Sequence, residues 1–169
     1  MIYGNADDFR EYMRVRGSSQ TDDFDDDRLE SALLVASEWL DSQYELIWIG
    51  YKTNGYKQER SWPRMSAVVT SFPFYVYNKD EIPEQVVKAT YEAASRELTS
   101  SGYLQVDYRP SLYKRATVEG AVSVDFNDLI YSSSDVQVEI PIIQGLMEQL
   151  IDPQKTGVIS PLSGQAVRV

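Results

Sequence analysis

The segment Ile82–Leu98 has the sequence IPEQVVKATYEAASREL and carries the clearest helix signals in the chain. Pro83 suits a first helical position, because its fixed φ is already helical and its missing N–H is not needed there. Glu84 follows in the first turn, where a carboxylate meets the positive end of the helix dipole. A small and apolar stripe recurs at three- and four-residue steps, and consists of Val86, Val87, Thr90 and Ala94. The segment is therefore predicted to be a core helix.

The same helix has a second stripe of alternating charge. Four charged residues follow one another at i,i+4 spacing: Glu84, Lys88, Glu92 and Arg96. Pairs at this spacing stabilise an exposed helix face and also suit a contact that must find its register. The stripe predicts either a solvated face or an interface.

The composition allows one domain with a real core and removes several kinds of chemistry. The 169 residues are 43% apolar and 12% aromatic, and they include no cysteine and no histidine. Disulfides, thiolate nucleophiles and imidazole metal sites are thereby excluded. No phosphate-binding glycine loop or nucleophile elbow is present. We expect a protein that is not an enzyme and that has no catalytic, cofactor-binding or metal-binding residues.

Charge and hydropathy restrict the partners. The net charge is −10, with 26 acidic and 16 basic residues, whereas free nucleic-acid binding normally needs a basic surface. No apolar run is long enough to span a bilayer, and the first residues lack the features of a signal peptide. The expectation is a soluble, non-exported protein that contacts other proteins and no membrane.

Two further helices are predicted in the first quarter of the chain. Asn5 is a good N-cap for a short amphipathic helix that ends near Gly17. A second helix runs from Arg28 to Tyr44, with an apolar stripe at helical period. The acidic run Asp22–Asp27 before it has two interpretations. It lacks the glycine and the late glutamate of a calcium-binding EF-hand loop, so the N-terminal entrance of the helix is the favoured one.

The loop Gly50–Arg64 is the most basic part of the chain and also contains aromatic residues. Basic residues among aromatics are typical of surfaces that bind single-stranded nucleic acid. The candidates for such a contact are Tyr51, Lys52, Tyr56, Lys57, Arg60, Trp62 and Arg64. In the alternative interpretation, Trp62 fills the core while the lysines and arginines meet acidic neighbours. The acidity of the whole chain favours this alternative.

The rest of the chain predicts extended segments and one more helix. Ser66–Asp80 is β-prone and interrupted by a proline, and Leu112–Phe126 alternates like a β-hairpin with its turn at Glu119-Gly120. Pro141 starts a short apolar helix that ends near Ile151. Asp152–Val169 has no periodicity and is expected to be an extended arm that orders on a partner. The predicted fold class is mainly α: a small helical bundle with a β-hairpin arm and an extended C-terminal tail.

Several of these segments together resemble a known family. They are YGNADDFREYMRVRG (Tyr3–Gly17), ALLVASEWLD (Ala32–Asp41), WPR (Trp62–Arg64), the helix IPEQVVKATYEAASREL and the β-prone segment Val118–Phe126. The chain resembles tailed-bacteriophage proteins that are often labelled DnaT-like single-stranded-DNA-binding proteins and that are similar to head–tail adaptor (connector) proteins. The resemblance covers about Tyr3 to Phe126. It predicts an adaptor domain over 1–126, followed by a linker and helix over 127–151 and an arm over 152–169, which depart from the usual ending of the family.

The adaptor resemblance implies a structural virion protein. Such a protein forms a ring beneath the portal, usually twelve-fold in the family, and lets packaged double-stranded DNA pass without sequence-specific binding. Its partners are then further copies of itself, the portal protein and a tail tube, nozzle or tail-fibre component. Its location is the head–tail interface of the virion, and the host cytoplasm during assembly. An acidic channel wall suits sliding DNA, because like charges oppose sticking.

Two groups of residues are candidates for contacts in such an assembly. The subunit-interface candidates are Glu84, Lys88, Glu92 and Arg96. The portal- or tail-contact candidates are Ile142, Ile143, Leu146, Met147, Leu150, Val158, Ile159 and Val167. The alternative function is single-stranded-DNA binding, as the family label suggests, through the loop Gly50–Arg64.

Overall fold

The structure is a computed structural model that describes residues 1–69, 74–105, 115–118, 122–125 and 140–155. The fold is mainly α, as predicted. Four α-helices are found in these ranges: α1 (Ala6–Val15), α2 (Asp26–Tyr44), α3 (Glu84–Thr99) and α4 (Pro141–Met147). Short 3-10 turns extend or connect them, namely η1 (Gln20–Asp23), η2 (Gly55–Lys57), η3 (Tyr103–Gln105) and η5 (Glu148–Leu150).

Local capping determines where the first two helices begin. The Asn5 side chain accepts a hydrogen bond from the backbone N–H of Asp8, and the Asp25 side chain accepts one from Arg28. Both are the side-chain-to-N3 bonds that satisfy a free donor at a helix start. The favoured interpretation of the acidic run, as the entrance of a helix, is confirmed by the position of Asp25. Pro83 is the N-cap of α3 and not its first helical residue, a shift of one position from the prediction.

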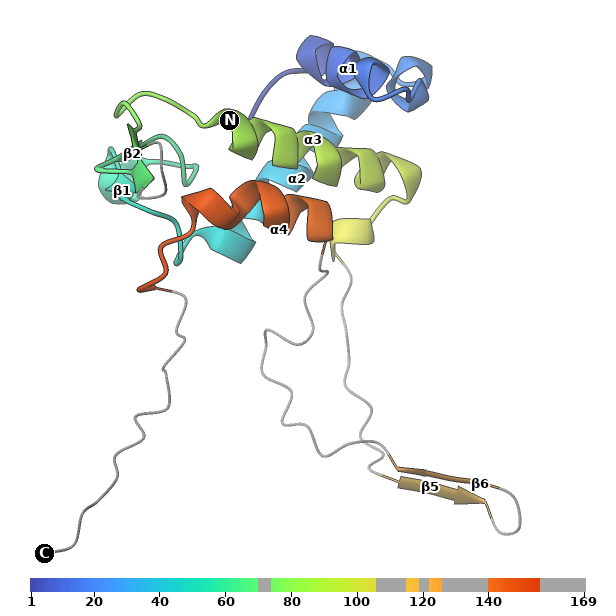
Figure 1. Cartoon of the computed structure of the whole chain (residues 1–169). Helices are drawn as coiled ribbons and strands as arrows, with labels where there is room; N and C mark the ends of the chain where they lie inside the picture. The colour runs from blue at the N-terminus through green and yellow to red at the C-terminus, as the bar shows by residue number, and fades with distance from the viewer. Residues whose placement is uncertain (70–73, 106–114, 119–121, 126–139, 156–169) are drawn as a thin grey trace, which may run out of the picture.

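Helix α3 lies at the centre of the bundle and contacts the other three helices. It crosses in front of α2, with α1 on one side and α4 on the other (Figure 1). The predicted stripe explains this position, since Val86, Thr90 and Ala94 are fully buried. Small residues, Ala89 and Ala93 among them, let neighbouring helices come close. The segment that dominates the sequence is therefore the helix around which the core forms.

Short antiparallel strand pairs complete the described structure. Strand β1 (Tyr51–Lys52) pairs with β2 (Arg64–Met65), and β3 (Val68–Val69) pairs with β4 (Tyr75–Val76). The predicted hairpin is present as β5 (Arg115–Val118) and β6 (Val122–Asp125), in the register Arg115↔Asp125 to Val118↔Val122. Its predicted turn, Glu119-Gly120, lies outside the described residues, as do 70–73, 106–114, 126–139 and the arm from 156 onward.

The strand pairs are joined to the helices by an aromatic contact and by one required glycine. Trp62 is fully buried and meets both Trp48 and Tyr77 edge-on, with ring centroids 5.7 and 5.6 Å apart. Gly50 has φ +67°, and a Cβ there would lie 2.5 Å from the carbonyl oxygen of Met65. Only glycine suits both the backbone angle and this close approach. Trp48 also meets Tyr44, the last residue of α2, at 5.4 Å, so ring contacts connect Trp62 and Tyr77 to the end of this helix.

Candidate functional site

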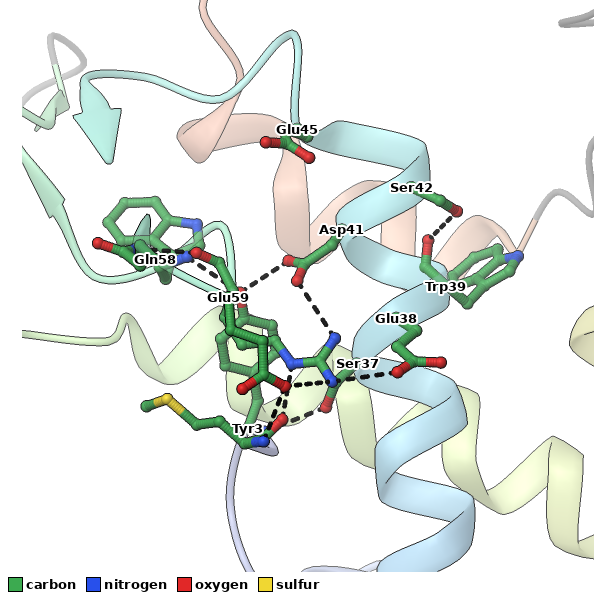
Figure 2. A network of polar contacts seen from close by, with 12 residues as sticks. Tyr3, Ser37, Glu38, Trp39, Asp41, Ser42, Glu45, Gln58 and Glu59 are labelled. Carbon is green, nitrogen blue, oxygen red and sulfur yellow. Dashed lines mark hydrogen bonds and ion pairs between the residues drawn. The ribbon is translucent and has the colours of Figure 1, made fainter. Parts of the chain in front are cut away.

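Arg60 belongs to a buried polar network that fastens the N-terminal segment to α2 (Figure 2). Its Nε donates to the carbonyl oxygen of Met1 at 2.6 Å, and its Nη1 lies 3.5 Å from Oδ2 of Asp41. The Tyr3 hydroxyl donates to Oδ1 of Asp41 at 2.7 Å and accepts from the backbone N–H of Trp62 at 3.0 Å. Arg60 therefore neutralises a buried carboxylate and has its charge compensated inside the protein.

Burial controls the protonation of this network. Desolvation raises the pKa of Asp41 above its usual value, against the lowering effect of the hydrogen bond from Tyr3 and the charge of Arg60. Desolvation, together with the negative charge of Asp41, also raises the pKa of the Tyr3 phenol. An aspartate with a raised pKa can mark a catalytic site. Here the carboxylate is enclosed by chain segments that it holds together, so its arrangement is structural.

Arg64 and Trp62 are also interior residues. Arg64 is 5% exposed and donates to three backbone carbonyl oxygens, those of Ile49 at 2.8 Å, Ser61 at 3.2 Å and Gly50 at 2.8 Å. Burial lowers the pKa of this guanidinium. Since its donors are occupied by the backbone and Trp62 is fully buried, neither side chain presents a surface to a nucleic acid. This arrangement matches the alternative interpretation of the loop, in which Trp62 fills the core.

The other DNA-contact candidates lie on the surface. Lys52 pairs with Glu45 at 2.5 Å and keeps 20% of its side chain exposed. Tyr56 and Lys57 form the exposed tip η2, where Tyr56 projects fully into solvent. Tyr51 is exposed beside Lys155, whose ammonium lies 5.2 Å from the centre of the ring. Of the seven candidates, Tyr51, Tyr56 and Lys57 are thus exposed, and the last two lie at the tip.

The structure adds two aromatic residues that the sequence interpretation did not select. Phe74, directly before β4, is 73% exposed, and Tyr75, the first residue of β4, is 49% exposed. A hydrogen bond of 2.8 Å from the Thr53 hydroxyl to the carbonyl oxygen of Lys79 ties this segment to the loop that carries the tip. We call the resulting set the exposed aromatic surface; its members are Tyr51, Tyr56, Phe74 and Tyr75, with Lys57 and Lys79 exposed in the same segment. The β-prone pattern of 66–80 was visible in the sequence, but its exposure was not.

The charged stripe of α3 is divided between surface and interior. Glu84 and Lys88 form an exposed pair at 2.7 Å. Glu92 is buried, accepts from the Tyr12 hydroxyl at 3.0 Å, and pairs with Arg16 and Arg96 at 3.1 Å each. Burial and the contact with Glu92 raise the pKa of Tyr12 to about 12. Glu92 therefore helps to hold α1 against α3 through Tyr12 and Arg16, and Glu84 and Lys88 remain on the surface.

The portal- or tail-contact candidates on the last helix are mostly part of the core. Ile143, Met147 and Leu150 are fully buried, and α4 packs on α3. Ile142 and Leu146 are half-buried and face the margin of this contact. Val158, Ile159 and Val167 lie outside the described residues. The apolar helix thus finds its covering partner within its own chain.

Among the residues that the structure describes, no group of three or more acidic side chains is arranged to hold a metal ion. No helix in the same ranges is long and apolar enough to cross a membrane.

The structure thus defines a small, mainly α-helical protein whose short strand pairs carry an exposed aromatic surface. A family model with the description "Putative DnaT-like ssDNA binding protein" matches residues 2–169. The chain belongs to this family. No curated protein and no solved structure matches it.

Proposed function

We propose that the protein binds single-stranded DNA through the exposed aromatic surface. The proposal is supported by one observation above all: four aromatic side chains between residues 51 and 75 are exposed, and Lys57 and Lys79 are exposed in the same part of the chain. The description of the family points to the same activity. The function needs no catalytic step and no cofactor.

Stacking, more than charge, supplies the affinity in this proposal. Each base that stacks on an aromatic side chain contributes about 1–3 kcal/mol, whatever its identity. Lysines next to the rings can meet phosphates, but the net charge of −10 opposes the approach of a polyanion. Binding is therefore expected to tolerate any sequence and to depend only weakly on salt, with a log–log slope of about −1.4 for two phosphate contacts.

Fluorescence anisotropy with a labelled oligothymidine tests the proposal. Replacing Tyr56 and Phe74 by alanine in one chain removes two exposed rings without opening the core, and should weaken binding at least tenfold, since about 1.4 kcal/mol is a tenfold change. Leu46→Ala is the matched control, because Leu46 is also exposed and apolar but lies outside this surface. Absence of binding by the unaltered protein at low salt would reject the proposal, as would equal binding by the double variant.

The second candidate is a head–tail adaptor that forms a ring beneath a phage portal. It is favoured by the acidic surface and by the amount of exposed apolar side chain between residues 51 and 76, where Met65, Val68 and Val76 join the aromatic residues. Exposed apolar patches often mark protein contacts. In this proposal the protein acts in the virion at the head–tail interface, after assembly in the host cytoplasm. The exposed pair Glu84–Lys88 and the half-buried Ile142 and Leu146 are its remaining described contact candidates.

Mass photometry of the chain mixed with its portal protein tests this second candidate. A ring-sized species, or a complex with the portal, is the expected result. The chain staying as single copies in the presence of portal would reject it. The two candidates are distinguished by which complex forms. Binding of oligothymidine without a ring or portal complex favours the first, and a ring or portal complex without oligothymidine binding favours the second.

A further inference from the structure

Helices α1 and α3 enclose a surface groove of about 310 Å³. All the residues that line it come from these two helices: Asp8, Glu11, Tyr12, Val15, Glu84, Val87, Lys88 and Tyr91. The volume is at the lower end of the range that holds a small organic ligand. One aromatic side chain is therefore a suitable occupant by size.

The groove has an apolar floor and an acidic rim. Val15 is 77% exposed although it is an apolar residue on a helix, and the ring of Tyr91 closes the base against Phe9 at 5.2 Å. The rim carries three carboxylates, on Asp8, Glu11 and Glu84, against the single ammonium of Lys88. Their present partners are surface contacts, such as Glu11 with Arg14 at 2.7 Å, which contribute little and can be exchanged. The groove thus suits an aromatic group that is accompanied by a positive charge.

The same chain presents a group of this kind on a different surface. At the tip η2, the fully exposed ring of Tyr56 is followed directly by the exposed ammonium of Lys57. Tyr56 makes a large apolar area available at low cost in side-chain entropy. The tip and the groove are therefore complementary in charge and in polarity.

We propose that the tip of one copy docks in the α1–α3 groove of a second copy, with the Tyr56 ring over Val15 and the Lys57 ammonium beside Glu11. The two surfaces differ, so the contact is heterologous: an open assembly keeps one free tip and one free groove, and a closed ring keeps neither. The contact is compatible with the ring of the second candidate but does not depend on it.

A consequence for DNA binding follows from the shared chemistry. The groove offers the tip negative charges beside an apolar surface. A single strand of DNA offers the same two features through its phosphates and its bases. Self-association and DNA binding then compete for Tyr56 and Lys57. This competition rests on the proposed DNA-binding function, whereas the contact between copies does not.

The contact is tested by exchanging the charges at positions 57 and 11 in the full chain and measuring self-association by sedimentation velocity. Lys57→Glu places a carboxylate beside the Glu11 carboxylate, and Glu11→Lys places an ammonium beside the Lys57 ammonium. Each variant alone should associate at least about tenfold more weakly than the unaltered protein, because like charges meet across the contact. An equimolar mixture of the two should associate again, because position 57 of each variant then finds an opposite charge at position 11 of the other.

Glu30→Lys is the matched control, since it makes the same change of charge at an exposed position on α2 outside the groove. This control should associate as well as the unaltered protein or better, because it reduces the negative net charge as much as Glu11→Lys does. Circular dichroism confirms that each variant is folded. A monomeric unaltered protein, unchanged association of the single variants, or failure of the mixture to associate overturns the proposal.

Addition of oligothymidine separates this inference from the proposed function. Dissociation of the assemblies by the oligonucleotide supports the competition. If the variants associate as predicted but the unaltered protein does not bind oligothymidine, the contact between copies is supported and DNA binding is rejected. Binding of oligothymidine by a protein that remains monomeric rejects the contact alone.

Discussion

At the scale of single residues, Asp41 connects the first residues of the chain with α2 and with the loop before Trp62. Its carboxylate accepts from the Tyr3 hydroxyl at 2.7 Å and lies 3.5 Å from Arg60. Desolvation raises its pKa despite these contacts. The folded state therefore binds a proton on Asp41 more tightly than the unfolded chain does. It follows that Asp41 lowers the stability of the protein as the carboxyl ionises.

Asp41→Asn is predicted to remove this dependence on pH. For a raised pKa, the stabilising contribution is complete below the usual value near 3.8 and is lost as pH rises through the higher folded-state value. The unfolding free energy of the unaltered protein should thus fall relative to that of the variant as the pH rises above the usual pKa near 3.8. Urea denaturation of both proteins at several pH values measures the difference. A difference that is the same at every pH would contradict the prediction.

At the scale of elements, α4 packs on the helical bundle of its own chain. Ile143 and Met147 are fully buried where α4 packs on α3, whereas Ile142 is only half-buried. A short helix of this kind is stabilised by tertiary packing and not by its own propensity. The last helix is thus an integral part of the core.

Met147→Ala is predicted to cost about 2–5 kcal/mol of unfolding free energy, because it leaves a cavity between α4 and α3. Ile142→Ala should cost less, since its side chain lies at the margin of the contact. Chemical denaturation of the two variants measures both losses. The comparison requires that the dependence of unfolding free energy on denaturant concentration is the same for both variants. Equal small losses would show that α4 contributes little to the stability of the isolated chain.

At the scale of the whole molecule, the excess of negative charge acts on stability and on partners together. The chain carries a net charge of −10, and its described ion pairs include several on the surface, such as Met1–Glu59 and Glu84–Lys88. Exposed pairs of this kind contribute at most about 1 kcal/mol. We therefore expect that screening the repulsion among the unbalanced carboxylates stabilises the protein more than weakening these pairs destabilises it.

Sodium chloride is predicted to raise the thermal unfolding midpoint near pH 7. Screening shortens the range of the repulsion from about 10 Å at 0.1 M salt to about 3 Å at 1 M. Differential scanning calorimetry across this range measures the change. The same series near pH 4.5, the isoelectric point of the sequence, is the control and should be nearly flat. A midpoint that falls with salt at pH 7 would show that the ion pairs outweigh the repulsion.

Much of the fold could be predicted from the sequence because it depends on local spacing. The N-caps Asn5 and Asp25, the period of the stripe in α3 and the alternation of Arg115–Asp125 each act over a few neighbouring residues. The candidate site was predictable only in part. Tyr56 and Lys57 were among the predicted contacts, but nothing local distinguishes their exposure from the burial of Arg60 and Arg64.

The sequence by itself determined that this protein is a helical bundle centred on Glu84–Thr99, without thiol or imidazole chemistry. Only the tertiary structure decided which charges and rings remain available to a partner. Arg60 and Arg64 are occupied by Met1, Asp41 and distant backbone carbonyls, and α4 is covered by α3. These contacts join residues far apart in the chain, and burial is a property of such contacts and not of residue type.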